Sequence, residues 1–136
     1  MKIKIQPDLE KAKGIKNLIQ SRKDFVNNFR GKIFPTVICE NYYEIIKELA
    51  TALFLSKGVK FVGEHAHKEL IENIAKLLNF EESLLNFLDD FRVRRNGSLY
   101  YGEPFEKVYL NNNKEKIELL IKKIEDCLDK QIGAEK

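Results

Sequence analysis

Residues 35–58 read PTVICENYYEIIKELATALFLSKG, and their pattern is that of a long helix in the centre of the fold. After Pro35, apolar side chains recur at intervals of three and four residues, and further apolar residues widen this face toward the end of the segment. The repeating positions are Ile38, Tyr42, Ile45, Leu49, Ala52 and Leu53. Lys57 and Gly58 are typical of the end of such a helix. We therefore expect a central helix over residues 36–57.

Four other segments show the apolar spacing of helices. Pro7 and Asp8 are suited to begin the first helix and Gly31 to end it, while Asn112 followed by Glu115 resembles the capping box of the last helix. The expected bounds are about 8–30, 64–79, 81–95 and 113–131. Short links make consecutive helices neighbours, so the sequence predicts an all-α fold, an antiparallel up-and-down bundle of four to five helices.

One connection is expected to be long. Residues 96–112 show no helical stripe, and a connection of this length in a compact domain is usually functional or mobile. The segment is also too aromatic for a simple solvated linker, since it contains Tyr100, Tyr101, Phe105 and Tyr109. We expect it to pack against the bundle or against a second subunit.

Length, charge and cysteine content favour one cytoplasmic domain over residues 1–136, because 136 residues suffice for one core and no membrane span or signal peptide is evident. The formal charge is +3, but it is uneven: residues 1–35 hold nine basic and three acidic residues, and residues 36–91 hold five and ten. These charges either complement each other within the fold or a dimer, or serve an anionic partner. Cys39 and Cys127 are expected to be core thiols in a reducing compartment.

A candidate phosphate site lies at the end of the fourth expected helix, which reads RVRRNGSLYYG from Arg92. Arg92 and Arg95 are three residues apart and project to one face of a helix, and a guanidinium can bind phosphate through two parallel hydrogen bonds. The nearby phenols of Tyr100 and Tyr101 can donate hydrogen bonds or stack on a base. The structural alternative is that the arginines pair with nearby carboxylates. Those carboxylates are Asp89, Asp90 and Glu103.

Two other aromatic and ionisable groups are candidates. On the central helix Tyr42 is expected in the core, which places Tyr43 about a hundred degrees around the helix, at a groove or interface where it could contact a ligand. His65 and His67 are two residues apart, do not share a helix face and lack a third ligand, so we expect no metal and no cofactor. His67 could act as a general base, but the sequence does not bring it to the arginines.

Several short features together resemble the HEPN domain family over most of the chain. They are Asn41-Tyr42-Tyr43, the segment ATALFLSKG at residues 50–58, histidines near the start of the next helix, and Arg95-Asn96 before the tyrosine pair. The resemblance implies a small helical bundle that is commonly a homodimer. It also implies a possible minimal nucleotidyltransferase partner, since many such domains are encoded beside one as toxin–antitoxin pairs.

Catalytic members of that family are metal-independent ribonucleases with an arginine followed by a histidine four to six residues later. Arg95 and Asn96 match the opening of this motif, but Tyr100 or Tyr101 stands in place of the histidine. A phenol with a pKa of about 10 is a poor base at neutral pH. The resemblance therefore implies a module that binds RNA, a nucleotide or a nucleotidyltransferase, with Arg92, Arg95 and Tyr43 contacting phosphate or ligand. The alternatives are an RNA endonuclease that uses Arg95, Asn96 and either a tyrosine or a distant histidine, and a purely structural dimeric scaffold.

Overall fold

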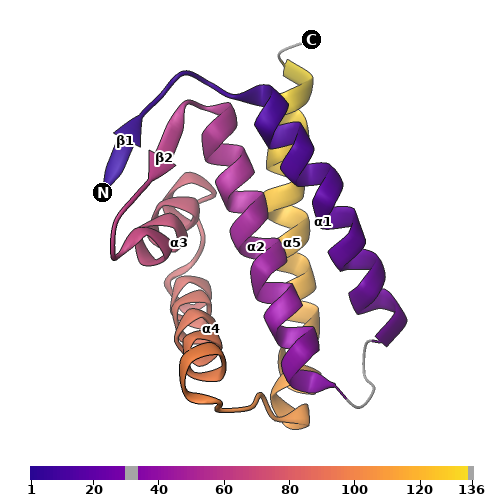
Figure 1. Ribbon diagram of the computed structural model, residues 1–136. Coiled ribbons are helices and arrows are strands. Elements are labelled where there is room, and N and C mark those ends of the chain that lie inside the picture. The colour runs from indigo at the N-terminus through magenta and orange to yellow at the C-terminus, as the bar shows by residue number, and fades with distance from the viewer. Residues whose placement is uncertain (30–33, 135–136) are drawn as a thin grey trace.

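The computed structural model describes residues 1–29 and 34–134, and five helices dominate this part of the chain (Figure 1). The helices are α1 Leu9–Phe29, α2 Pro35–Ser56, α3 Ala66–Leu77, α4 Glu82–Tyr101 and α5 Lys107–Ala134, and the strands are β1 Lys2–Lys4 and β2 Val59–Phe61. The predicted all-α class is confirmed. The expected end of the first helix at Gly31 lies outside the described residues.

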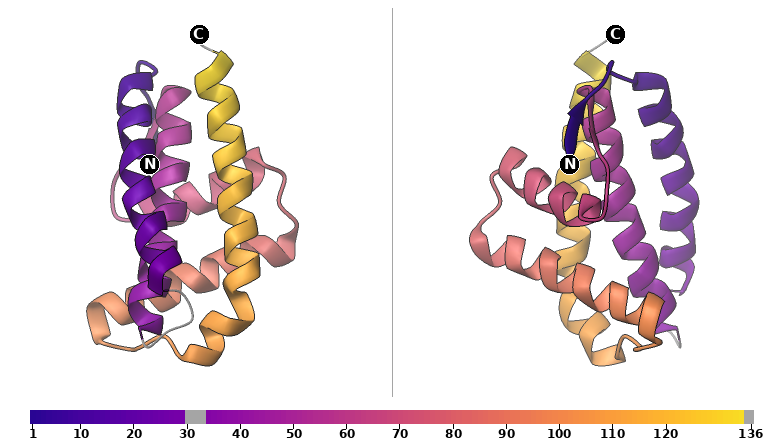
Figure 2. Two further views of the ribbon diagram at one scale, coloured as in Figure 1. Left: turned by 90° about the vertical axis from the view of Figure 1, so that its right-hand side faces the viewer. Right: turned by 60° about the vertical axis from the view of Figure 1, so that its left-hand side comes forward.

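Helix α2 is the centre of the molecule, as its pattern predicts. It lies between α1 and α5 in both views of Figure 2, and thirteen of its residues are buried. Its apolar positions meet those of α1 and α5 in one core. The buried residues include Ile38, Ile45, Leu49 and Leu53 from α2, Ile19 and Val26 from α1, and Ile117, Leu120, Ile124 and Leu128 from α5. Burial of side chains of this size on all sides of one helix supplies most of the driving force for the fold.

The simple up-and-down arrangement is not observed. Helix α1 runs antiparallel to α2, but α2 and α5 run in the same direction, and α3 and α4 lie across them (Figures 1 and 2). The reason is that two helices stand between α2 and α5 in the sequence and carry the chain back to the end where α2 began. The crossing brings the start of α3 beside the C-terminal half of α4.

The predicted long connection over residues 96–112 is wrong. Helix α4 continues through Asn96 to Tyr101 and α5 begins at Lys107, so only five residues join them. Asn96-Gly97 does not break α4, because Gly97 is buried where the next segment folds back on it, and an added Cβ would lie 2.8 Å from a carboxylate oxygen of Glu103. The helix instead ends at Gly102, which has a φ of 66° and is in the left-handed conformation that glycine favours.

The predicted start of the last helix near Asn112 is also too late. Phe105, before the first turn of α5, is 5% exposed and packs edge-on against Phe91 of α4, with ring centroids 5.8 Å apart. Its ring also lies 5.4 Å from that of Tyr109 in α5. This packing holds the first turns of α5 against the bundle. The aromatic segment thus packs as predicted at Phe105 and Tyr109, whereas Tyr100 and Tyr101 are exposed.

A short two-stranded sheet was not anticipated. Strands β1 and β2 are antiparallel, with Ile3 opposite Lys60. Gly58 permits the pairing, because its φ is 77° and an added Cβ would lie 2.6 Å from the carbonyl oxygen of Ile5. The sheet places β2, and the start of α3 that follows it, over one side of α2 (Figure 2).

Candidate nucleic-acid interface

The three arginines of α4 have different surroundings. The side chain of Arg95 is 12% exposed and forms an ion pair with Glu44 of α2. Its guanidinium carbon also lies 5.3 Å from the centre of the Tyr43 ring, a cation–π geometry. Arg95, the expected centre of the site, is therefore held inside the helix packing.

Glu44 binds two cations at once. Besides its ion pair with Arg95, it forms one with Lys47 at 2.7 Å, and its side chain is 16% exposed. Burial by itself would raise the pKa of this carboxyl, but the hydrogen bond and charge of Lys47 and the charge of Arg95 outweigh it and hold the pKa below its ordinary value. Glu44 is consequently ionised at neutral pH and fixes Arg95 in place.

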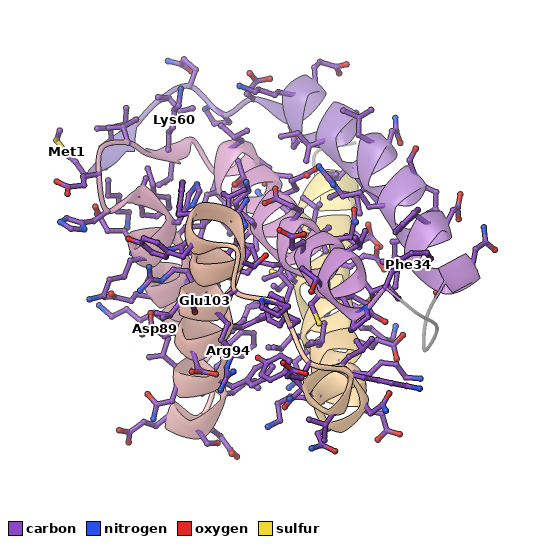
Figure 3. All side chains as sticks on the ribbon, turned by 60° about the horizontal axis from the view of Figure 1, so that its bottom comes forward. Met1, Phe34, Lys60, Asp89, Arg94 and Glu103 are labelled. Atoms are coloured by element: carbon purple, nitrogen blue, oxygen red, sulfur yellow. The ribbon has the colours of Figure 1, made fainter. Side chains whose placement is uncertain are left out.

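Arg94 projects to the side of α4 that faces α5. It pairs with Asp90 at 2.8 Å, and its guanidinium carbon lies 4.8 Å from the centre of the Tyr109 ring. Figure 3 shows Arg94 near the end of the bundle at which Glu103 follows α4. The structural alternative, pairing with nearby carboxylates, therefore holds for Arg94 with Asp90 and for Arg92 with Asp89. Arg95 is also paired, but its partner is Glu44 rather than a carboxylate near it in sequence.

Arg92 is only 17% exposed and forms an ion pair with Asp89. It lines a cleft of about 490 Å³ between the start of α3 and the side of α4, which we call the α3–α4 cleft. The cleft is lined by Gly63, Glu64, His65, Ala66, His67, Lys68, Arg92, Asn96 and Tyr100. Two N–H groups of Arg92 donate to one oxygen of Asp89, at 3.0 and 3.1 Å, and within the described residues its Nη1 makes no hydrogen bond. Arg92 thus keeps donors available in the cleft.

Asn96 and Tyr100 follow Arg92 at intervals of four residues and line the same cleft. Asn96 is half-buried, and its side-chain amide has no hydrogen-bond partner in the described ranges, 1–29 and 34–134. Tyr100 is 68% exposed. An arginine, an amide and a phenol on one helix face, all with free donors, can together bind an oxyanion.

The opposite wall of the cleft is the start of α3. No side chain caps this helix, so its positive N-terminal end faces the cleft without a capping carboxylate or hydroxyl. Lys68 adds a cation, and Glu64 is the single carboxylate among the lining residues. The cleft is therefore suited to a phosphate group and has the geometry of a helix-end anion site.

His67 is the group that the sequence could not place. It lines the cleft together with Arg92. Partial desolvation, followed by the positive charges of Lys47 and Arg95, lowers its pKa below 6.5, against the opposing effect of Glu44. His67 is therefore largely neutral at neutral pH and can accept a proton. Nothing in the spacing along the chain indicated this, since it depends on α3 crossing over α4.

Two predicted site residues lie elsewhere. Tyr43 is 1% exposed and packs edge-on against Phe91 at 5.6 Å, and burial raises the pKa of its hydroxyl to about 12. It therefore lies in the core rather than at a groove, and contributes by supporting Arg95. Tyr101 is 78% exposed and is not among the residues that line the cleft.

Three further observations concern metal ligands, membrane-spanning helices and the charge of α1. In the part of the chain that the structure describes, no group of three or more His, Cys, Asp or Glu side chains is arranged to hold a metal ion. Among the same residues, no helix is long and apolar enough to cross a membrane. The basic residues of α1 are partly neutralised within the fold, because Arg22 pairs with Glu48 at 2.7 Å and Lys23 with Glu125 at 2.6 Å.

Comparison with known proteins gives no family assignment. No protein-family model matches the chain, and no curated protein or solved structure shows significant similarity to it. The geometry of the cleft is therefore the basis for proposing a function.

Proposed function

We propose that this protein is a HEPN-like helical module that binds the phosphate groups of RNA or of a nucleotide in the α3–α4 cleft. The observation that carries the proposal is the convergence of Arg92, Asn96 and Tyr100 on the unsatisfied N-terminal end of α3. Each group is a hydrogen-bond donor, and each has a donor without a partner in the described residues. Together they match the charge and the acceptor oxygens of a phosphodiester.

The test compares two arginines on different sides of α4, each of which pairs with an aspartate of the same helix. Arg92→Ala removes a cation from the cleft, and Arg94→Ala removes one from the opposite side of the same helix, where it pairs with Asp90. We expect Arg92→Ala to weaken binding of a labelled single-stranded RNA about tenfold and to reduce the slope of log K against log salt by about 0.7, the value for one phosphate contact on a single strand. Arg94→Ala should have a much smaller effect.

Binding is measured by fluorescence anisotropy at several salt concentrations in a chelating buffer. Equal losses in the two variants would show a response to net charge alone and would contradict a site in the cleft. No binding of RNA or mononucleotide by the wild-type protein would overturn the proposal.

A second candidate activity, metal-independent RNA cleavage, is favoured by the position of His67. A neutral imidazole can accept the proton of a ribose 2′-hydroxyl as that oxygen attacks phosphorus and the 5′-oxygen leaves, while Arg92 stabilises the charge on the phosphate. His67→Gln should abolish cleavage in chelator and leave RNA binding intact. Cleavage of an all-deoxy substrate, or full activity of His67→Gln, would contradict this mechanism.

A homodimer is the proposed assembly. Large apolar side chains are exposed along the second half of α4 and the first turn of α5, among them Val93, Leu99, Tyr101 and Val108, which are 50% to 78% exposed. Where such side chains form a contiguous patch they are typical of an interface, and these are the candidates for one. Sedimentation velocity should show a dimer that dissociates in Tyr101→Ala. A monomer at all concentrations in the wild-type protein would contradict the assembly and leave the cleft proposal in place.

A further inference from the structure

A second cavity adjoins the α3–α4 cleft and has a different character. It has a volume of about 180 Å³ and shares Ala66 and His67 with the cleft. It lies where α1, α2, β2 and α3 meet. We call it the lysine-rimmed pocket, lined by Lys11, Lys47, Thr51, Phe54, Leu55, Val59, Lys60, Phe61, Ala66, His67 and Leu70. Because the two cavities share residues, one ligand can occupy both.

The floor of this pocket is aromatic and apolar. Phe54 is 6% exposed and Phe61 is half-buried, and their rings meet edge to face with centroids 5.1 Å apart. An aromatic floor of this kind favours a flat, apolar ring system, since base–aromatic stacking contributes about 1–3 kcal/mol per base. The volume suits a single base and excludes a larger group such as a folded RNA loop.

The rim of the pocket is strongly cationic. Lys11 and Lys60 form no ion pair in the described part of the chain, and Lys47 keeps donors beyond its ion pair with Glu44, since an ammonium has three. Figure 3 labels Lys60, which lies on β2. No carboxylate lines this pocket. The rim therefore favours a ligand edge that carries acceptor oxygens.

Thr51 supplies a hydrogen-bond acceptor beside these lysine donors. Its hydroxyl donates a 2.8 Å hydrogen bond to the carbonyl oxygen of Lys47, so the proton is occupied and the oxygen can only accept from a ligand. Lysine donors beside a hydroxyl acceptor match an edge on which carbonyl oxygens flank an N–H group. Uracil has this edge, and guanine has the part formed by O6 and its neighbouring N–H. Cytosine and adenine present an amino donor where the lysines also donate.

We propose that the lysine-rimmed pocket binds the base of the nucleotide whose phosphate occupies the α3–α4 cleft, and that it selects keto bases over amino bases. This inference rests on the proposed function, because the phosphate must lie beside Arg92 for the base to reach Phe61. His67 lies between the two subsites, next to the sugar of the bound nucleotide. The protein would then read single-stranded RNA with a preference for uridine or guanosine.

The experiment compares three probes by amide NMR and titration: uridine 5′-monophosphate, cytidine 5′-monophosphate and ribose 5-phosphate. All three should shift the amide signals of the cleft. Only the uridine nucleotide should strongly shift those of Thr51 and Phe61, and it should bind about fivefold more tightly than the cytidine nucleotide. Equal binding of the two nucleotides would overturn the base pocket while leaving the phosphate site intact. Failure of ribose 5-phosphate and both nucleotides to bind would overturn both proposals.

A matched pair of double variants isolates the rim. Lys11→Ala with Lys60→Ala should abolish the preference for uridine and leave ribose 5-phosphate binding close to that of the control. The control, Lys57→Ala with Lys76→Ala, removes the same charge from exposed positions that line neither cavity. A uridine preference that survives in the first double variant would contradict recognition by the lysine rim.

Discussion

Two neighbouring faces of α4 carry similar residues in different surroundings. On the packed side, Arg95 is enclosed between Glu44 and the ring of Tyr43, and Phe91 is fully buried. On the open side, Arg92 and Asn96 line a cleft and keep unused donors. The difference shows that a cluster of arginines in a sequence is not one site: one turn of helix separates a residue enclosed by Glu44 and Tyr43 from one that pairs with Asp89 and lines a cleft.

The largest loss of stability should come from removing the ring of Phe105, which packs against α4 and α5. Phe105→Ala removes a 5% exposed ring from its contacts with Phe91 and Tyr109 and leaves a cavity, which should lower the free energy of unfolding by about 3 kcal/mol. Tyr101→Ala, four residues earlier and 78% exposed, should change it by less than about 0.5 kcal/mol in the monomer. Urea denaturation at low protein concentration measures both. Similar losses would show that the aromatic cluster does not anchor α5.

The next largest loss of stability should follow a substitution of Glu44. Glu44→Gln leaves the guanidinium of Arg95 nearly buried without its counter-ion, which should cost about 2 kcal/mol of unfolding free energy. The control is Asp90→Asn at the half-exposed pair with Arg94, where a change below about 1 kcal/mol is expected.

The loss of unfolding free energy in Glu44→Gln should also depend on pH. The folded-state pKa of Glu44 lies below the ordinary value of 4.5, so its stabilising contribution is complete above that pH and is lost as the pH falls through the folded pKa. The difference between wild type and Glu44→Gln should therefore shrink in acid. A difference that stays constant from pH 7 to pH 3 would show that the charge of Glu44 does not stabilise the fold.

Arg95 and Arg92 can be compared directly by the same substitution. Arg95→Met keeps an apolar side chain against Tyr43 but removes the ion pair with Glu44, so it should lower stability. The salt dependence of RNA binding should stay close to that of the wild type. Arg92→Met should reduce the salt slope and lower stability less than Arg95→Met does, because its partner Asp89 is 45% exposed and stays solvated without it. Thermal denaturation and anisotropy at several salt concentrations separate the two effects. A reduced slope in Arg95→Met, with none in Arg92→Met, would place phosphate on the packed side.

Much of the fold could be predicted because the helices have strong apolar periodicity. The central helix over residues 36–57 agrees with α2 to within a residue, since its core face is nearly continuous. The end of α4 was missed because Asn96-Gly97 is a common turn signal, and only tertiary packing, with Glu103 against Gly97, shows that the helix continues. Local signals at helix ends were overridden wherever a later segment packed on them.

The candidate site could be predicted only in part. Arg92, Asn96 and Tyr100 share a helix face, so their proximity follows from sequence spacing once α4 is known to continue. The placement of Arg95 depends on Glu44, which is fifty-one residues away, and that of His67 depends on the crossing of α3 and α4. Contacts of this kind have no local sequence signal.

The smallest effect, a shift in the titration of His67, tests the open side most directly. In the free protein, burial and the charges of Lys47 and Arg95 keep the His67 pKa below 6.5. A phosphate beside Arg92 brings negative charge to the imidazole and stabilises its protonated form, so the His67 pKa should rise on binding. By linkage, RNA affinity should strengthen as the pH falls through the free-protein value. NMR titration of the imidazole signals with and without RNA measures the shift, and Arg92→Ala should abolish it at the same RNA concentration. An unchanged His67 pKa at saturating RNA would mean that the phosphate lies outside the cleft, and the open side of α4 would then be, like its packed side, a structural surface.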